Sequence, residues 1–308
     1  MASNRTFTLA TGAKLPALGL GTWKSTPDKV KEAVKVALET GYRHIDCAPV
    51  YCNEAAIGEA IIQSQVPRDQ LWITSKLWCT EYHPKDVLPA CEQTLKDLQL
   101  DYLDLYLLHW PFAFLKEGDQ CCTAKRDSNG KPQLDTTVNL AETWKAMEEL
   151  VHLGKVKHIG VANFNVAQLQ DLIAGATIKP AVCQAEGHLY CQNTKLVEYC
   201  QAQGIQFLAY GPLGTSFCST HVLANPILLQ IASSTQRTAA QVALAWAVQR
   251  GTAAIPKSVT PDRIRENFQN DLVLSPEQMS QLAAITTKMR VCIPYDTWNI
   301  PKGTLFDD

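Results

Sequence analysis

The feature that most constrains this chain is a repeated alternation of short apolar segments with longer segments of helical spacing. The apolar segments begin near Leu18, His44, Leu71, Tyr102, Val156, Ala181, Ile205 and Ala253. Each one is followed by a segment whose apolar residues recur every three or four positions, as in an amphipathic helix. Alternating strands and helices predict an α/β fold, and eight such units predict a (β/α)8 TIM barrel.

The remaining segments predict additions to the barrel. Phe7 to Leu15, with Thr11-Gly12 in the middle, is typical of an N-terminal β-hairpin. We expect two extra helices, near Asn225 to Ser233 and from Ser275 to about Lys288. The length of 308 residues suits a single domain, 1–308, with a C-terminal tail, 291–308, over the barrel mouth.

Two connecting segments are predicted without secondary structure. A polar loop runs from Trp110-Pro111 to about Thr137, and its length favours a functional role. The glycines of Gly211-Pro212-Leu213-Gly214 predict a turn, with the next helix starting near Asn225.

Charge and composition exclude several classes of function. A net charge of -2 provides no basic surface for nucleic acid. No segment approaches the ~20 apolar residues of a membrane span, and the N-terminus lacks the apolar run of a signal peptide. The 11 cysteines contain no Cys-x-x-Cys pair, which predicts reduced thiols instead of disulfides or a zinc site. We therefore expect a cytoplasmic monomer that binds no nucleic acid, no membrane and no metal.

Ionisable residues gather where the predicted strands end. Asp46, Lys76 and His109 end the second, third and fourth strands, and Tyr51 lies in the turn after Asp46. The carboxyl ends of barrel strands form the rim on which active sites lie, so these side chains are expected to meet there. A buried lysine needs a counter-charge, and Asp46 is the expected partner.

These residue types suit proton transfer to a carbonyl group. A lysine cation about 4 Å from a phenol stabilises the phenolate by roughly 4 kcal/mol at an effective dielectric near 20. We therefore expect Lys76 to lower the pKa of Tyr51 from its ordinary value of about 10 into a working range. His109 lies between apolar neighbours, so it should stay neutral and hydrogen-bond a carbonyl oxygen.

Structural alternatives exist for each of these residues. Asp46 could cap the next helix with Tyr51 packed on it, His109 could be a satisfied core histidine, and Lys76 could be a surface lysine. A zinc hydrolase is disfavoured because the first strand reads Gly19-Leu20-Gly21-Thr22, without a His-x-His pair.

A phosphate site is predicted where the last strand opens into a helix. Ile255-Pro256-Lys257-Ser258 leads to Pro261, and the backbone amides of a helix start attract an anion. Lys257 and Arg263 add two cations, which would suit a phosphate on a ribose. The alternative is two solvated side chains at a helix end. Gly19-x-Gly21 lacks the third glycine of a Rossmann fingerprint, so a dinucleotide would bind without that fold.

Over nearly its whole length the chain resembles the aldo-keto reductases. The motifs that carry the resemblance are Gly19-Leu20-Gly21-Thr22-Trp23, Gly41-Tyr42-Arg43-His44-Ile45-Asp46, Thr74-Ser75-Lys76-Leu77-Trp78, Leu107-Leu108-His109-Trp110-Pro111, Gly160-Val161-Ala162-Asn163-Phe164 and Ile255-Pro256-Lys257-Ser258. Within the family it is most similar to the NADP-dependent aldehyde reductase (alcohol dehydrogenase, NADP+) branch, through Gly21 to Ser25, His44 to Ala48 and Asp97 to Leu100.

The resemblance implies a catalytic tetrad and a cofactor. The tetrad would be Asp46, Tyr51, Lys76 and His109, with NADPH extended across the barrel mouth. The implied cofactor-binding residues are Gly21, Thr22, Trp23 and Asp46; Asn163 and Gln184 at the carboxamide; Tyr210 stacked on the nicotinamide; Leu213 to Thr215 over the pyrophosphate; Lys257, Ser258, Val259, Thr260 and Arg263 around the 2′-phosphate; and Glu266 and Asn267 at the adenine. The small-molecule carbonyl substrate would meet Trp23, Val50, Tyr51, Trp78, His109, Trp110 and Trp298.

The chain also departs from the family pattern. Ala162 replaces a serine, Cys183 replaces an asparagine, and Gly187-His188-Leu189 replaces a motif that commonly ends in His-Pro. The tail after Cys292 is shorter than in the aldehyde reductase branch. The hypothesis is an NADPH-dependent reductase of aldehydes, sugar-derived, uronate-type or α-keto, that yields alcohols. The alternative is an NADPH-binding barrel protein with a regulatory role.

Overall fold

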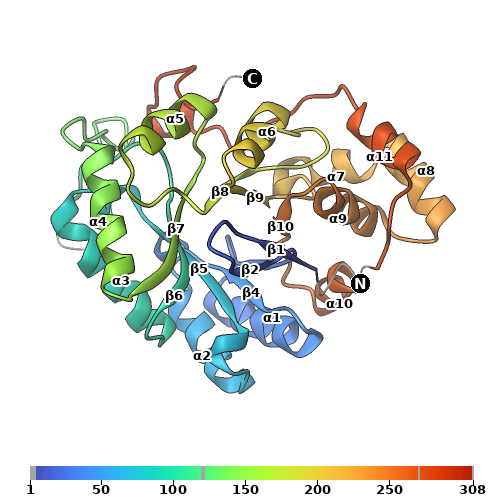
Figure 1. Cartoon of the computed structure of the whole chain (residues 1–308), viewed down its shortest axis with the longest axis horizontal. Helices are drawn as coiled ribbons and strands as arrows, with labels where there is room; N and C mark the ends of the chain where they lie inside the picture. The colour runs from blue at the N-terminus through green and yellow to red at the C-terminus, as the bar shows by residue number, and fades with distance from the viewer. Residues whose placement is uncertain (1–4, 119–121, 270, 307–308) are drawn as a thin grey trace.

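The structure, a computed structural model, describes residues 5–118, 122–269 and 271–306 and is organised around a parallel sheet. Its eight strands follow chain order: β3 (Leu20–Gly21), β4 (His44–Asp46), β5 (Trp72–Leu77), β6 (Leu103–Leu108), β7 (Val156–Ala162), β8 (Val182–Glu186), β9 (Gln206–Tyr210) and β10 (Ala253–Ile255). Parallel bridges from Leu18 to Ala254 and from Gly21 to Lys257 join the first strand to the last. The sheet therefore closes, and the predicted TIM barrel is confirmed (Figure 1).

Helices surround the barrel, as Figure 1 shows. They are α1 (Pro27–Thr40), α2 (Glu54–Ser64), α3 (Pro84–Leu98), α4 (Leu140–His152), α5 (Val166–Gly175), α6 (Thr194–Ala202), α7 (Thr215–Leu223), α8 (Pro226–Thr235), α9 (Ala239–Gln249), α10 (Pro261–Phe268), α11 (Pro276–Ala283) and α12 (Tyr295–Trp298), with 3-10 turns η2 (Pro49–Tyr51), η3 (Arg68–Gln70) and η4 (Cys79–Glu81). Several starts follow local sequence, because Asn165, Thr238 and Ser275 form capping boxes at α5, α9 and α11.

The N-terminal hairpin closes one end of the barrel. Strands β1 (Thr6–Thr8) and β2 (Lys14–Pro16) pair antiparallel, as predicted, and Figure 1 shows the hairpin lying across the barrel. Leu9 and Leu15 belong to the cluster that fills the barrel interior, together with the first residues of β5, β8 and β10. The amino-terminal end is thus plugged, which leaves the carboxyl end as the mouth.

Helix α7 lies between the predicted Gly211-Pro212-Leu213-Gly214 turn and the helix predicted near Asn225, and it was not predicted. Its sequence, Thr-Ser-Phe-Cys-Ser-Thr-His-Val-Leu, lacks a clean apolar stripe. The helix is held by burial, because Cys218 and Val222 pack in the cluster that also contains α9. Tertiary packing of this kind supplies most helical stability in short helices.

Helix α11 is shorter than predicted, since it ends at Ala283 and not near Lys288. The amide of Gln192 donates to the carbonyl oxygens of Leu282, Ala283 and Ile285, which satisfies the helix end. Residues 285–290 beyond it have no regular secondary structure, and the amide of Met289 donates to the carbonyl oxygen of Tyr190 at 2.8 Å.

The long segment after Trp110 is more ordered than the predicted polar loop. Antiparallel bridges join Phe114 to Leu134, Lys116 to Ala124 and Arg126 to Pro132, so the segment folds back on itself. Residues 119–121 of this segment lie outside the described part.

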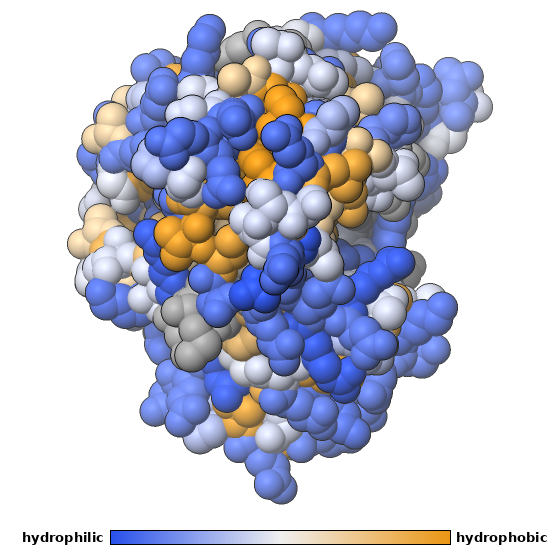
Figure 2. All heavy atoms as spheres, turned by 90° about the vertical axis from the view of Figure 1, so that its right-hand side faces the viewer, coloured by the Kyte–Doolittle hydropathy of each residue, from blue (hydrophilic) through white to orange (hydrophobic). Residues whose placement is uncertain are grey.

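The outer face formed by α8 to α11, which Figure 2 turns toward the viewer, carries mostly hydrophilic residues with apolar patches between them. None of the helices in the described part of the chain has both the length and the apolar character to cross a membrane.

Candidate active site

A buried ion pair lies at the centre of the barrel mouth. Lys76 in β5 donates to the Oδ1 atom of Asp46 at 2.6 Å and to the carbonyl oxygen of Cys47 at 2.7 Å. The side chain of Lys76 is 0% exposed. Burial is the largest influence and disfavours its charge, but the attraction of Asp46, then that of Tyr51, and the hydrogen bond to Asp46 together hold the pKa of Lys76 above its ordinary value. Lys76 is therefore a fixed cation, as the sequence predicted.

Tyr51 lies beside this cation at the end of η2. The Nζ atom of Lys76 is 5.2 Å from the centroid of the Tyr51 ring, and that ring stands edge-on to His109 at 5.9 Å between centroids. The expected fall in the pKa of Tyr51 was wrong. Burial raises the pKa of Tyr51 to about 12, and the charge of Lys76 opposes this rise without reversing it. Tyr51 therefore keeps its proton through the neutral range.

His109 follows β6 and forms part of the mouth. Burial, followed by the charge of Lys76, lowers its pKa well below the ordinary value, so the ring is neutral, as expected. Its Nδ1 atom finds no hydrogen-bond partner among the described residues. The ring packs edge-on against Trp78, with 5.1 Å between centroids.

Three residues predicted at the cofactor are bonded to this cluster. Gln184 donates to the Oδ2 atom of Asp46 at 2.7 Å, so both carboxylate oxygens of Asp46 are occupied. Asn163, at a positive φ of 65°, donates to the carbonyl oxygen of His109 at 2.9 Å and accepts from the hydroxyl of Tyr210 at 2.8 Å. The tetrad and these side chains thus form one connected network.

The loop after β3 is fixed against the same cluster. Thr22 donates to the carbonyl oxygen of Asp46 at 2.7 Å. Asn53, which the sequence reasoning missed, donates to the carbonyl oxygens of Thr22 and Ser25, each at 3.0 Å. Its position two residues after Tyr51 was the available signal. Trp23 in this loop is 41% exposed, and the Nζ atom of Lys24 lies 4.4 Å from the centroid of its ring.

The residues predicted at the phosphate form a second group, at the end of β10 and the start of α10. Lys257 and Arg263 are both exposed there. Partial burial and then the charge of Lys29 lower the pKa of Lys257, so α1 contributes a nearby cation that the sequence reasoning missed. The amide of Thr260 donates to the Oγ atom of Ser258 at 3.1 Å.

The other predicted cofactor residues lie around these two groups. Gly21 connects the loop after β3 to the segment after β10, because its amide donates to the carbonyl oxygen of Pro256 at 3.1 Å. The two segments are so close that a Cβ at Gly21 would lie 3.0 Å from the carbonyl oxygen of Ile255. Glu266 already accepts a hydrogen bond from Thr238 at 2.6 Å. Of the other residues predicted at the cofactor, Asn267 is buried, and Val259 and Leu213 are partly buried against the core. Thr215 is the first residue of α7.

Aromatic rings form a wall beside Tyr51 and His109. Trp298 from α12 meets Trp78 and Trp110 edge-on, with centroids 5.7 and 5.1 Å apart. Phe112 and Phe114, which were not predicted, complete the wall at 6.2 and 5.7 Å from Trp298. Their spacing directly after Trp110-Pro111 could have indicated them. The predicted Val50 is half-buried in η2.

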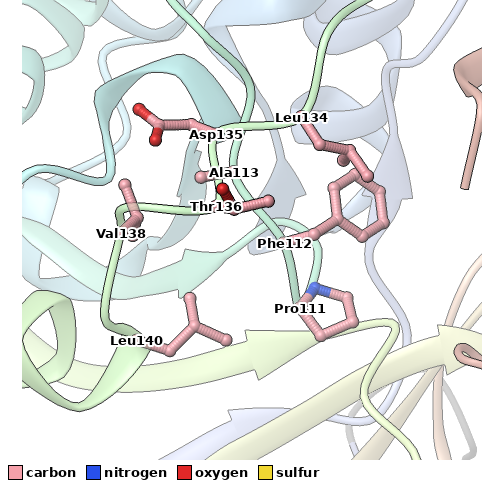
Figure 3. Close-up of a pocket in the computed structure, with 8 residues that line it drawn as sticks. All are labelled: Pro111, Phe112, Ala113, Leu134, Asp135, Thr136, Val138 and Leu140. Atoms are coloured by element: carbon pink, nitrogen blue, oxygen red, sulfur yellow. The ribbon is translucent and has the colours of Figure 1, made fainter.

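Phe112 also lines a separate surface pocket of about 250 Å³, shown in Figure 3. Its other lining residues include Leu134, Val138 and Leu140.

Within the described residues, no group of three or more His, Cys, Asp or Glu side chains is arranged to hold a metal ion.

The chain is similar to known proteins over most of its length. Residues 17–287 match the family model described as "Aldo/keto reductase family". The chain is 47% identical to rat aldo-keto reductase family 1 member A1 over 301 residues, which cover 94% of this chain and 91% of that protein. The human member A1 is also 47% identical, over 298 residues, with 93% and 90% covered.

Two solved structures share the fold. The aldose reductase from Schistosoma japonicum superimposes with a TM-score of 0.92 at 44% identity, covering 98% of this chain and 100% of that chain. The aldose reductase from Giardia lamblia gives a TM-score of 0.88 at 43% identity, with 94% and 98% covered. The matched model, relatives and structures together show that this chain belongs to the aldo/keto reductase family, whose members are oxidoreductases that act on carbonyl groups with NAD(P)H.

Proposed function

We propose that this chain is an NADPH-dependent reductase of aldehydes. The observation that carries the proposal is the Lys76–Asp46 ion pair, buried beside Tyr51 and the neutral His109. Sugar-derived, uronate-type and α-keto aldehydes are the proposed substrates. The similarity to member A1 proteins and to two aldose reductases supports that class.

The proposed chemistry assigns one task to each member of the tetrad. NADPH, when bound, would supply the hydride that reduces the carbonyl carbon. Tyr51 donates its phenolic proton to the carbonyl oxygen, and a pKa near 12 suits this role because the donor must arrive protonated. A developing alkoxide is a stronger base than a phenolate, so the transfer is downhill. Lys76, held by Asp46, stabilises the phenolate that remains.

His109 is proposed to orient the substrate. A neutral imidazole can donate one hydrogen bond to the carbonyl oxygen without adding a charge to the site. The aromatic wall of Trp78, Trp110 and Trp298 excludes water from the same place, which strengthens each electrostatic contact.

The residues present suit a phosphorylated dinucleotide. Asn163 and Gln184 place amides beside the tetrad, where they would hold the carboxamide, and Tyr210 lies next to Asn163, where it would stack on the nicotinamide. Lys257 and Arg263 are exposed cations at the start of α10 and would take the 2′-phosphate, with Lys29 as a further cation. Because Glu266 is bonded to Thr238, its proposed contact with the adenine must share that carboxylate.

Replacing Tyr51 by Phe tests the proposal. The variant keeps the aromatic packing on His109 but loses the proton donor, so turnover should fall by about 10²-fold to 10⁴-fold or more. Affinity for NADPH, followed by fluorescence, should change little. Full activity of Y51F with an aldehyde panel would refute the assigned mechanism.

The regulatory alternative predicts a different result with the unmodified protein. In that case NADPH fluorescence would be quenched on mixing, but no aldehyde of the panel would oxidise the cofactor.

A single catalytic domain spanning 1–308, with the tail 291–308 over the mouth, belongs to the proposal. A cytoplasmic location and a monomeric state stay predictions as well, and light scattering of the purified protein tests the latter.

A further inference from the structure

Glu186, at the end of β8, is a fully buried carboxylate for which the proposed chemistry has no use. It is bonded on both oxygens. Its Oε1 atom accepts from His188 at 2.8 Å and from the amide of Val291 at 2.9 Å. Its Oε2 atom accepts from the amides of Val291 and Cys292 at 3.1 and 2.7 Å. A charged group with this many donors is anchored firmly, since hydrogen bonds to ionised acceptors are the strong ones.

The two amides belong to a segment, residues 289–306, that we call the C-terminal strap. Arg290, next to the bonded amides, donates to the Oδ1 atom of Asn193 at 2.6 Å. The far end of the strap is held separately, because Gln168 in α5 donates to the carbonyl oxygen of Thr304 at 2.9 Å. The strap is therefore attached to the barrel at both ends.

The middle of the strap carries the aromatic wall. Trp298 lies between the two attachments and contacts Trp78, Trp110, Phe112 and Phe114. Apart from the short α12, this part of the strap has no regular secondary structure of its own. Its placement must therefore come from the attachments, from the rings themselves and from Ile300, Leu305 and Phe306, which are buried in the core at its far end. Local contacts of this kind set how easily a segment opens.

We propose that Glu186 is a positioning residue for the substrate pocket: by holding the amides of Val291 and Cys292, it fixes the strap so that Trp298 stands against Trp78 and Trp110. It acts on the wall that large aldehydes contact and not on the reacting atoms. The kinetic test of this proposal rests on the proposed reductase function. A second readout, the rate of trypsin cleavage, does not depend on that function.

The test replaces Glu186 by Gln. The amide keeps one acceptor oxygen but turns an NH₂ group toward backbone N–H donors, so at least one of these donors loses its partner. We expect KM for a bulky aldehyde, 2-naphthaldehyde, to rise about tenfold, as the loss of one such bond would produce. Turnover of a small aldehyde, glyceraldehyde, and affinity for NADPH should stay within about twofold, because the tetrad is untouched.

Limited trypsin digestion supplies the second readout. Cleavage after Arg290 breaks the peptide bond whose nitrogen, that of Val291, is held by Glu186. Because proteolysis follows local opening, E186Q should be cut at this bond about tenfold faster than the unmodified protein, as mass spectrometry would show.

Glu148 provides a matched control. Its carboxylate is also buried and also accepts two backbone amides, those of Thr177 and Ile178 at 2.7 and 2.8 Å, but it lies on α4. E148Q should change neither the KM ratio of the two aldehydes nor the cleavage after Arg290.

A double-mutant cycle with Trp298→Ala locates the effect. If Glu186 acts through the strap, adding E186Q to W298A should raise the KM for 2-naphthaldehyde little further, since coupled residues are not additive. The proposal is overturned if E186Q leaves both KM and cleavage unchanged, or if it lowers NADPH affinity and glyceraldehyde turnover instead. If the unmodified protein reduces no aldehyde, the proposed function fails, and the cleavage rate alone decides about Glu186.

Discussion

The two halves of the proposed cofactor site differ in how complete they are. At the tetrad, Asp46 is bonded on both oxygens, and Asn163 and Gln184 bond to the same cluster. At the start of α10, Lys257 and Arg263 stand exposed, and Lys29 adds a like charge near Lys257. The first region holds its charges in place before any ligand arrives, whereas the second presents cations to solvent.

This difference separates chemistry from selectivity. Preorganised charges in a water-excluded site act on the reaction itself, because they need no rearrangement when the substrate reacts. Exposed cations act on binding, since each gains a counter-charge only when an anion arrives. Substitutions in the first region should therefore change turnover, and substitutions in the second should change cofactor affinity.

Lys76→Met should have the largest effect. It removes the stabiliser of the Tyr51 phenolate, so turnover should fall by about 10³-fold or more in an NADPH oxidation assay. It also leaves the Asp46 carboxylate buried without a counter-charge, which should lower the free energy of unfolding by about 3–5 kcal/mol in denaturant melts.

Lys157→Met is the control for that substitution. Lys157 pairs with Asp104 at 3.3 Å near the start of β7, and its side chain is 49% exposed. Turnover of this variant should match the unmodified protein. Retained turnover in K76M would show that the ion pair serves packing and not catalysis.

Lys257→Ala and Arg263→Ala should give the next largest effect. Each removes one charge-assisted contact with the 2′-phosphate, so Kd for NADPH should rise about 10-fold to 100-fold in fluorescence titrations. Kd for NADH, which lacks that phosphate, should stay unchanged. A smaller rise is expected for Lys29→Ala.

Arg265→Ala serves as the matched control on the same helix, because Arg265 pairs with Asp262 at 3.2 Å. Its affinity for both cofactors should equal that of the unmodified protein. Equal use of NADPH and NADH before any substitution would contradict the assignment of a 2′-phosphate site.

The smallest effect on turnover is expected for Glu54→Gln, since Glu54 is a buried residue of α2 outside the tetrad. Ser75, whose neighbour on β5 is Lys76, donates to Glu54 at 2.6 Å, and burial raises the pKa of Glu54 to about 8. The folded protein thus holds this proton above pH 4.5, where the unfolded chain releases it. The free energy of unfolding should therefore fall as pH rises from about 4.5 through about 8, by an amount on the order of a few kcal/mol.

Urea melts at several pH values across this range test that expectation. E54Q should remove most of the pH-dependent fall in the free energy of unfolding and leave turnover nearly unchanged. Glu59→Gln on the same helix, where Glu59 pairs with Lys31 at the surface, should leave the pH profile as it is. An identical pH profile in E54Q would mean that Glu54 is ionised in the folded protein.

Much of the fold could be predicted because its signals are local. Apolar segments bounded by glycine and proline marked the strands, and capping residues such as Thr238 and Ser275 marked helix starts. Helix α7 escaped prediction because its residues carry no apolar periodicity, and only packing of Cys218 and Val222 makes it a helix.

The members of the candidate site were predictable, and so were the charged Lys76 and the neutral His109, but the pKa of Tyr51 was not. Strand ends indicated Asp46, Lys76 and His109, and the structure places them together. The pKa of Tyr51 was predicted in the wrong direction, because a pairwise charge argument omits the loss of water around a buried phenol. Asn53, Glu186 and Phe112 were missed, since their partners lie in distant segments that the sequence does not bring together.

The sequence by itself determined the eightfold order of strands and helices and the residue types at the strand ends, because periodicity and turn chemistry act between near neighbours. The tertiary structure alone decided the protonation of Tyr51, the attachment of the C-terminal strap by Glu186 and the separation of the closed tetrad from the exposed cations. Burial and long-range hydrogen bonding depend on the position of every other segment, and these terms set the charges of the site.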